Sequence, residues 1–204
     1  MPTNRSYVDA CGIARALDVI GERWALLLVR ELLLGPQRFV DLRRALPGAS
    51  SNLVADRLRE MRERGVISRR RLPPPAGSDV YELSEWGREL EPIVLALGGW
   101  GIRVPVPAGA TLSASSVLLY LRGSVDPGER TFRVQLDDRV WTVRAEGGEV
   151  VVEPGEPQRA DGSLRTDPRT LNELLADPAA LPSAIADGRA ETVGDLTRLI
   201  SRVR

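Results

Sequence analysis

The chain has 204 residues, 43% of them apolar, and 28 basic residues balance 28 acidic ones. This length allows one large or two small domains with hydrophobic cores. The lack of histidine excludes imidazole metal ligands and His-dependent nucleophiles, and a single cysteine, Cys11, excludes a disulfide within one chain. The sequence has no glycine-rich phosphate loop and no apolar run near 18 residues. We therefore expect a cytoplasmic protein that is not an enzyme, binds no metal or cofactor and does not enter a membrane.

The first elements predicted are two helices. One extends from about Tyr7 to Ile20, where apolar residues recur at helical spacing. The second covers Glu22 to Leu34 and is closed by Gly35 and Pro36, which stop a helix. Because it is apolar on nearly every side, we expect it to be buried and to support the elements that follow.

Two short helices joined by a tight turn come next, over Phe39 to Leu46 and within Gly48 to Gly65. Ser50 or Ser51 can cap the second helix, and Gly65 allows the left-handed residue that ends it. Its helical period separates an apolar arc from an outward arc. The apolar arc holds Leu53, Val54, Leu58 and Met61, and the outward arc holds Asn52, Ala55, Asp56, Arg59 and Glu63. This arrangement predicts a helix-turn-helix unit.

Two extended segments, Val66 to Leu72 and Val80 to Leu83, flank a turn rich in proline and glycine, which predicts a β-hairpin. Between Arg38 and Arg71, ten arginines stand against four acids, an excess of six positive charges. Such a stretch is either a solvated charged face or a phosphate-binding surface. The order helix, helix, hairpin favours a winged DNA-binding surface. Arg57 projects near the apolar arc, so we expect it to form a structural ion pair.

A further helix is predicted from Ser84, with Pro92 producing a kink or a later start. An apolar stripe runs along it at helical spacing: Trp86, Leu90, Ile93, Val94, Leu97 and Trp100. The stripe can pack on its own domain or against a second chain. We expect a homodimer, because winged-helix proteins that read two-fold sites need one.

A linker, Arg103 to Thr111, leads to a second domain. Alternating apolar residues predict an antiparallel meander of three strands, and helical periods predict helices on one side of it, which is an α+β layer fold. The helices are expected at 113–122, 168–175, 178–185 and from Gly194 to the C-terminus, and the strands at 131–136, 139–145, 150–153 and 190–193.

Two family resemblances support this division. The segments RALDVIGERWALLLVRELLLGPQRFVDLRRALPG, LVADRLREMRERGVISRR and YELSEWGRELEP resemble the HxlR family of bacterial winged-helix regulators. This resemblance implies a mainly α winged helix-turn-helix domain over 1–104 that binds operator DNA as a homodimer. The segments SLRTDPRTLNELL and AIADGRAETVGDLTRLI, with the meander, resemble the sterol carrier protein type of domain. That resemblance implies an α+β domain over 111–204 with an apolar tunnel for lipids or other hydrophobic molecules.

Double-stranded DNA is therefore the expected partner, and both domains have candidate site residues. Asn52, Ala55 and Arg59 are expected to face base edges. The expected phosphate contacts are Arg43, Arg44, Ser50, Ser51, Arg69, Arg70 and Arg71. Ala76 to Asp79 stand at the wing tip, where HxlR members often carry a basic residue, so the predicted contact moves to Arg69, Arg70 and Arg71. The expected tunnel lining, which could also be plain core, is Leu118, Leu121, Phe132, Val134, Trp141, Val143, Leu174 and Ile185.

Three functions compete at this point. The first is a dimeric transcription regulator whose second domain binds a hydrophobic small molecule that modulates operator affinity. The second is a redox-sensing regulator that acts through Cys11, whose thiol pKa Arg15 could lower; the alternative is an inert thiol. The third is a lipid-binding or accessory module in which DNA binding is secondary.

Overall fold

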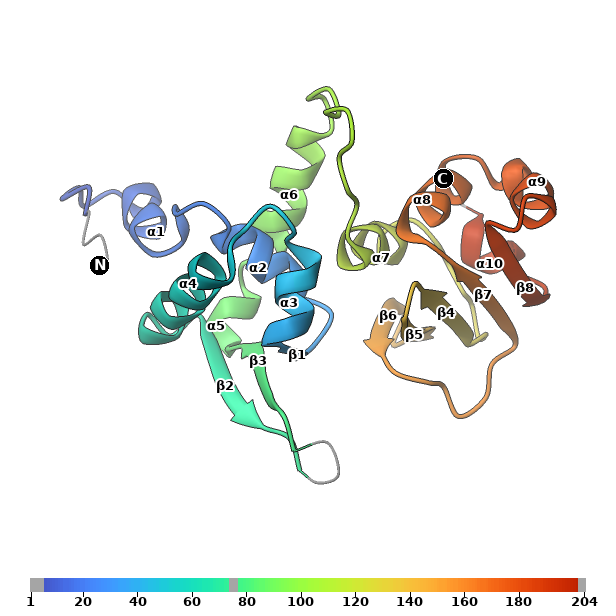
Figure 1. The fold of residues 1–204 in the computed structure, drawn as a ribbon, viewed down its shortest axis with the longest axis horizontal. Coiled ribbons are helices and arrows are strands. Elements are labelled where there is room, and N and C mark those ends of the chain that lie inside the picture. The colour runs from blue at the N-terminus through green and yellow to red at the C-terminus, as the bar shows by residue number, and fades with distance from the viewer. Residues whose placement is uncertain (1–5, 74–76, 202–204) are drawn as a thin grey trace. The chain divides into compact units, whose positions relative to one another are not determined.

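The computed structural model describes residues 6–73 and 77–201 and divides into two compact units, Met1–Gly109 and Ala110–Arg204 (Figure 1). In the first unit, helices surround a small antiparallel sheet with strand order β1-β3-β2. Its elements are α1 (Gly12–Ile20), α2 (Ala25–Leu32), β1 (Gln37–Arg38), α3 (Phe39–Ala45), α4 (Ser51–Glu63), β2 (Ile67–Arg71), β3 (Asp79–Leu83), α5 (Glu85–Arg88) and α6 (Glu91–Gly101).

One hydrophobic core joins α2, α3, α4 and the hairpin of the first unit. Leu28 and Val29 of α2 are fully buried, as are Leu42 of α3 and Val54 of α4. The expectation that the second apolar helix supports the helix-turn-helix is confirmed by this shared core. Glu31 is buried in α2, where Arg30 pairs with its carboxylate at 2.5 Å and the Gln37 amide donates to its backbone carbonyl.

The N-terminal helices are shorter than the sequence predicted. α1 begins at Gly12 instead of Tyr7, and α2 begins at Ala25 instead of Glu22. The backbone of Trp24 has φ = 79°, in the left-handed region, so the helical path is interrupted immediately before α2. Hydrophobic periodicity does not reveal this break in the helix, because apolar residues continue through it.

The predicted helix after the wing is divided into α5 and α6, and Pro92 lies in the first turn of α6, as its position required. Its apolar stripe is also divided. Leu90 and Val94 pack against the core of the first unit, whereas four other members of the stripe face solvent. Their exposed fractions are 51% for Trp86, 53% for Ile93, 48% for Leu97 and 70% for Trp100.

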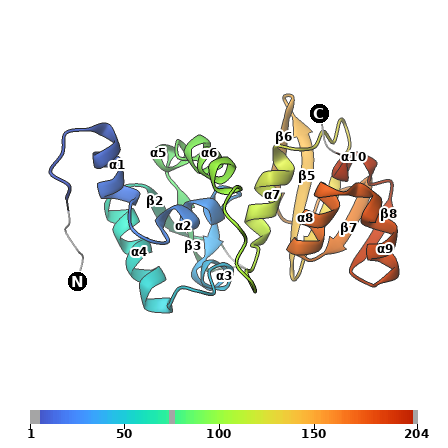
Figure 2. The same cartoon turned by 90° about the horizontal axis from the view of Figure 1, so that it is seen from above.

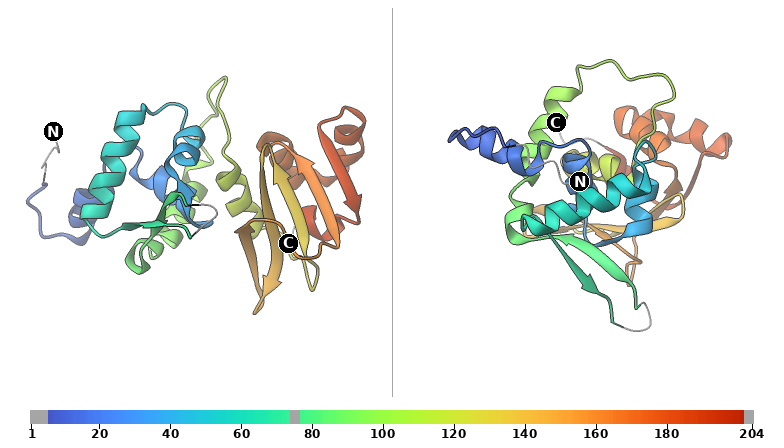
Figure 3. Two further views of the ribbon diagram at one scale, coloured as in Figure 1. Left: turned by 60° about the horizontal axis from the view of Figure 1, so that its bottom comes forward. Right: turned by 60° about the vertical axis from the view of Figure 1, so that its left-hand side comes forward.

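The second unit is a five-stranded sheet with strand order β6-β5-β4-β7-β8 (Figure 3). α7 and α8 lie against one face of the sheet (Figure 2). Its elements are α7 (Ala114–Arg122), β4 (Phe132–Leu136), β5 (Arg139–Glu146), β6 (Glu149–Pro154), β7 (Gly162–Thr166), α8 (Pro168–Ala176), a 3₁₀ turn (Pro178–Ala180), α9 (Leu181–Ala186), β8 (Ala190–Gly194) and α10 (Thr197–Ile200). The end predicted for the last helix, at Val203, lies outside the described residues.

The sheet of the second unit is mixed. β4, β5 and β6 form the predicted antiparallel meander, but β7 pairs with β4 in parallel, and the sequence did not predict β7. Leu164 and Thr166 of β7 are buried while Ser163 and Arg165 between them are not, so the alternation of a half-buried strand was present in the sequence. The parallel pairing requires a long connection, here the whole meander, and no local signal marks it.

Candidate nucleic-acid interface

The centre of the site is α4, whose ends form as the sequence predicted. The Leu53 N–H donates to Ser50 Oγ at 3.2 Å, which makes Ser50 the N-cap. After the helix, Gly65 adopts φ = 76°, a conformation that glycine reaches without a Cβ penalty. Capping at both ends gives the helix a fixed length and a fixed exit toward the hairpin.

The two faces of α4 have opposite surroundings. Val54, Leu58 and Met61 are no more than 1% exposed. Asn52 and Ala55 lie on the opposite, solvent-exposed face together with Arg59, whose guanidinium pairs with Asp56 at 2.7 Å. The structure therefore brings together on one accessible surface the three side chains expected to face base edges.

Two of the candidate phosphate contacts around the turn, Arg43 and Ser51, are linked by a hydrogen bond. Arg43 of α3 donates from Nε to Ser51 Oγ at 3.3 Å and from Nη1 to the Leu46 carbonyl at 3.4 Å. Arg44 is exposed. The Ser50 hydroxyl accepts the capping bond and keeps its proton for a further acceptor. The start of α4 thus presents hydroxyl donors and cations close to its free backbone N–H groups, a combination that suits a phosphate.

The wing arginines Arg69, Arg70 and Arg71 are exposed, but each has an acceptor. Arg69 pairs with Asp79 at 2.5 Å, and its guanidinium lies 5.9 Å from the centre of the Tyr81 ring. Arg70 Nε donates to Glu82 at 3.0 Å, and Arg71 Nε donates to the Gly77 carbonyl at 3.1 Å. The hydrogen bond to Asp79 raises the pKa of Arg69. Exposed pairs of this kind contribute little stability, so a phosphate can replace the carboxylate.

Sequence reasoning did not predict that Asp79 and Glu82 pair with the wing arginines. With these two acids the stretch from Arg38 to Leu83 has ten arginines against six acids, which leaves an excess of four. The hairpin register brings the acids diagonally across from the arginines. Asp79 is two residues along β3 from Tyr81, the residue opposite Arg69, and Glu82 is two residues from Val80, the residue opposite Arg70. The alternating pattern of β2 and β3 could be read from the sequence, but the register that pairs the two strands could not. Of the predicted wing tip, Ala76 lies outside the described residues.

Comparisons with known proteins agree with this geometry. Residues 19–106 match the family model described as HxlR-like helix-turn-helix. The HTH-type transcriptional regulator YdeP of Bacillus subtilis is 34% identical over 96 residues, which cover 46% of this chain and 73% of YdeP. YybR of the same organism, also named as an HTH-type transcriptional regulator, is 35% identical over 96 residues, 46% of this chain and 74% of YybR.

The chain belongs to the HxlR-like helix-turn-helix family. It is a transcriptional regulator of this type, and the family implies DNA as its partner. Among solved structures, one titled "Redox regulator HypR in its oxidized form" is 33% identical, with 48% of this chain and all of that chain covered and a TM-score of 0.45. The HxlR-like match ends at residue 106, before the second unit begins.

Cys11 lies in the first unit, ahead of the residues that match the family model and immediately before α1, and is exposed. The backbone N–H groups of Ile13 and Ala14 lower the pKa of its thiol. The sequence had suggested the Arg15 side chain for this effect, but the cause in the structure is the start of α1, whose amides favour a negative charge. The backbone N–H of Arg15 donates to the Cys11 carbonyl at 3.0 Å.

The predicted lining of the second unit lies mostly in close packing. Seven of its side chains are 0 to 1% exposed, and the eighth, Ile185, is 42% exposed. The seven are Leu118, Leu121, Phe132, Val134, Trp141, Val143 and Leu174. A hollow of about 430 Å³ in this unit is polar and is lined by Asp137, Asp167 and Arg189, among others. Such a lining does not suit a hydrophobic molecule.

In residues 6–73 and 77–201 no helix is both long and apolar enough to cross a bilayer. Over the same ranges, no three acidic or cysteine side chains gather in a way that could hold a metal ion.

Proposed function

We propose that this protein binds operator DNA as a homodimer, with α4 in the major groove and the β2–β3 wing along the sugar-phosphate backbone. The observation that carries the proposal is the outward face of α4. Asn52, Ala55 and Arg59 are accessible there, on a helix whose opposite face is buried in the core. A helix held in this way can enter the groove without unfolding its own domain.

The chemistry of this face fits base edges. An asparagine amide pairs with adenine, an arginine guanidinium pairs with guanine, and an alanine methyl packs on the thymine methyl. Arg59 must exchange Asp56 for a base to do so, and both partners are about half exposed, 47% and 50%. Exchange of so exposed a pair costs little.

A random-sequence DNA selection with the full chain, followed by titration of the selected duplex at several salt concentrations, tests this proposal. If each protomer neutralises about four phosphates, the slope of log K against log salt is about −7 for the dimer. Asn52→Ala and Arg59→Ala should each weaken binding to the selected duplex by about 1–3 kcal/mol. Arg88→Ala, on α5, is the control that removes a cation away from α4. A flat salt response would count against DNA as the partner.

The proposed dimer is supported by apolar side chains that the first unit leaves in water. On α6 these include Ile93 and Trp100, and on α1 they include Ile13, which is 73% exposed. Large apolar residues on two helices of one domain are typical of a surface that a second chain covers. A dimer also gives the two copies of α4 that a two-fold operator requires.

For the second unit we propose the role of effector domain, in which a hydrophobic small molecule binds and alters operator affinity. We place the ligand in the apolar layer between the sheet and the helices α7 and α8. Because the side chains of this layer are closely packed, the ligand would have to displace contacts between them. Native mass spectrometry of protein purified from its own host, with a gel shift before and after ligand removal, tests this role. Ligand without any effect on DNA binding would favour a lipid-binding or accessory module. An empty second unit would argue against both.

A thiol switch is the second candidate function, favoured by the exposure of Cys11 and its lowered pKa. With one cysteine per chain, hydrogen peroxide would oxidise two thiols to a disulfide that joins two protomers, or one protein thiol and one small thiol. Peroxide should then change DNA binding by the wild type and leave Cys11→Ser unaffected. A Cys11→Ser protein that still responds to peroxide would eliminate this candidate.

A further inference from the structure

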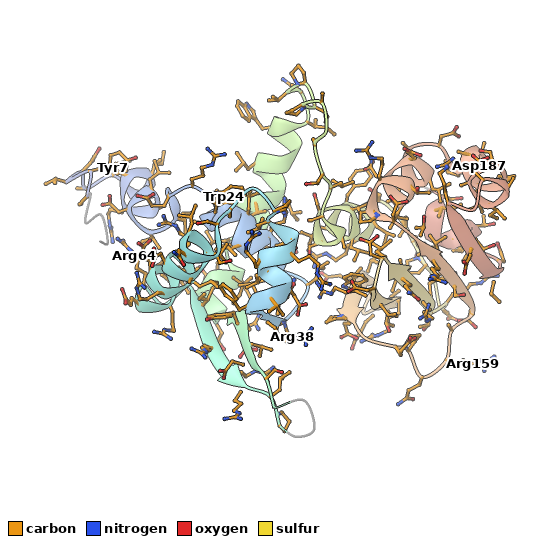
Figure 4. All side chains as sticks on the ribbon, in the orientation of Figure 1. Tyr7, Trp24, Arg38, Arg64, Arg159 and Asp187 are labelled. Atoms are coloured by element: carbon orange, nitrogen blue, oxygen red, sulfur yellow. The ribbon has the colours of Figure 1, made fainter. Side chains whose placement is uncertain are left out.

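The junction between α1 and α2, residues 21–24, touches the helix-turn-helix at two separate points. Trp24 is the N-cap of α2 and has φ = 79°, a conformation that a large L-residue rarely adopts. Its ring is partly buried against the core of the first unit (Figure 4). The surroundings must hold such a residue in place, because an isolated chain would relax to another conformation.

The first contact point is the turn between α3 and α4. A Cβ added to Gly48 would lie 2.9 Å from Cη2 of the Trp24 ring. The turn therefore lies directly on the indole, and glycine is required there for the closeness of this approach. Any side chain at position 48 must push either the ring or the turn aside.

The second contact point is on α4 itself. Arg57 is only 8% exposed, and its Nη2 lies 3.3 Å from a carboxylate oxygen of Glu22, while its Nη1 donates to Glu60. Within the described residues, Arg57 Nε is buried without a hydrogen-bond partner. A buried guanidinium with an unpaired donor depends strongly on the acids that remain to it. Glu22 supplies such an acid from outside the helix.

We propose that Glu22 and Trp24 are positioning residues, which set the rotation and depth of α4 and so determine which side chains reach the DNA bases. Two contacts, one at the turn and one on the second turn of α4, fix both the place and the rotation of the helix. Successive residues are separated by 100° around a helix, so a rotation well below that angle already moves the Asn52 and Arg59 side chains away from the base edges that they would contact. Base contacts depend on this geometry, whereas phosphate contacts by long side chains tolerate small shifts.

This inference rests on the proposed DNA binding, and the first test uses Glu22→Gln. The Glu22 side chain is 47% exposed, so the variant is expected to fold. The measurement is the ratio of affinities for the duplex selected by the wild type and for a scrambled duplex of the same composition. We expect this ratio to fall about fivefold with an unchanged salt slope, because α4 turns while the phosphate contacts persist. The variant should still unfold in one cooperative transition, at a lower midpoint, because Arg57 loses one of its acids. Glu89→Gln, which removes the same charge from an exposed position at the end of α5 instead of from α4, should leave the ratio unchanged.

A double-mutant cycle tests the Trp24 contact. Gly48→Ala alone should lower the ratio, since its methyl group meets Cη2 of the indole. In a Trp24→Phe background, Gly48→Ala should lower this affinity ratio by a smaller factor, because phenylalanine lacks that atom. Such a difference would show that the two sites are coupled. If Gly48→Ala lowers the ratio by the same factor in both backgrounds, or if Glu22→Gln leaves the ratio unchanged, the inference is overturned while the proposed function stands. A wild type with no preference for any selected duplex would overturn both.

Discussion

The two units of this chain treat their large apolar side chains in opposite ways. The first unit leaves Trp86, Ile93 and Trp100 at least half exposed, whereas the second keeps Phe132 and Trp141 at no more than 1% exposure. Exposed aromatic residues cost free energy in water, so a stable protein covers them with a partner. We therefore expect a partner to cover the exposed tryptophans of the first unit, whereas the aromatic side chains Phe132 and Trp141 of the second unit are covered by its own core.

The two units also differ in how their charges are balanced. On the side of the sheet away from α7 and α8, arginines of the second unit pair with its own glutamates: Arg133 with Glu156 at 2.7 Å and Arg165 with Glu191 at 3.3 Å. The Glu156 pair raises the pKa of Arg133 and lowers the pKa of the glutamate. The first unit instead has an excess of arginine from Arg38 to Leu83. A polyanion is therefore attracted to the first unit.

The largest effect is expected in the core of the second unit. Phe132→Ala should lower the free energy of unfolding by about 3–5 kcal/mol, because it empties a fully buried site. Ile185→Ala, at a residue that is 42% exposed, should change it by less than about 1 kcal/mol. Urea denaturation followed by circular dichroism measures both. A small cost for Phe132→Ala would show a loosely packed layer and would support the tunnel.

The next effect concerns the apolar surface of the first unit. Trp100→Asp should weaken dimerisation about thirtyfold or more, since a tryptophan at the centre of an interface contributes at least about 2 kcal/mol. The fold of the monomer should be unaffected, because the side chain is 70% exposed. Sedimentation equilibrium gives the dissociation constant. Val193→Asp, at a residue 71% exposed in the second unit, is the control. Equal dimerisation by Trp100→Asp would remove α6 from the interface.

A smaller effect is expected in the wing. Asp79→Asn should release Arg69 for a phosphate, strengthen DNA binding about threefold and steepen the salt slope. The matched control is Asp195→Asn in the second unit, where Asp195 pairs with Arg130 at 2.8 Å. Both variants remove one negative charge per chain, and only the first should alter the titration. Equal gains from the two would mean that net charge, and not the wing, controls affinity.

The smallest effect is a shift in thiol reactivity. Because the pKa of Cys11 is lowered, its alkylation by iodoacetamide should reach half of its maximal rate at a lower pH in the folded chain than in the chain unfolded by urea. The rate rises with pH as the thiolate forms, so the folded curve lies on the acidic side. Coincident curves would show that the start of α1 does not act on the thiol.

Local sequence signals predicted much of the candidate interface. A capping serine, a glycine exit and an apolar period determined α4, and the same period indicated that Arg57 would form a structural pair, which its contacts with Glu60 and Glu22 confirm. The placement of Asn52 and Arg59 on the accessible face followed from the period alone. These signals act between residues within two turns of helix, so the local sequence is sufficient to predict these features.

Other features appeared only when distant segments met. The sequence by itself determined the helix-turn-helix, the hairpin and the three-stranded meander, since caps, turns and periods are properties of chain neighbours. Tertiary structure decided the parallel pairing of β7 with β4, the acids beside Arg69 and Arg70, and the contact of Trp24 with the Gly48 turn. The physical reason is that sheet register, ion pairing across strands and close approach of backbones depend on which remote residues share a surface.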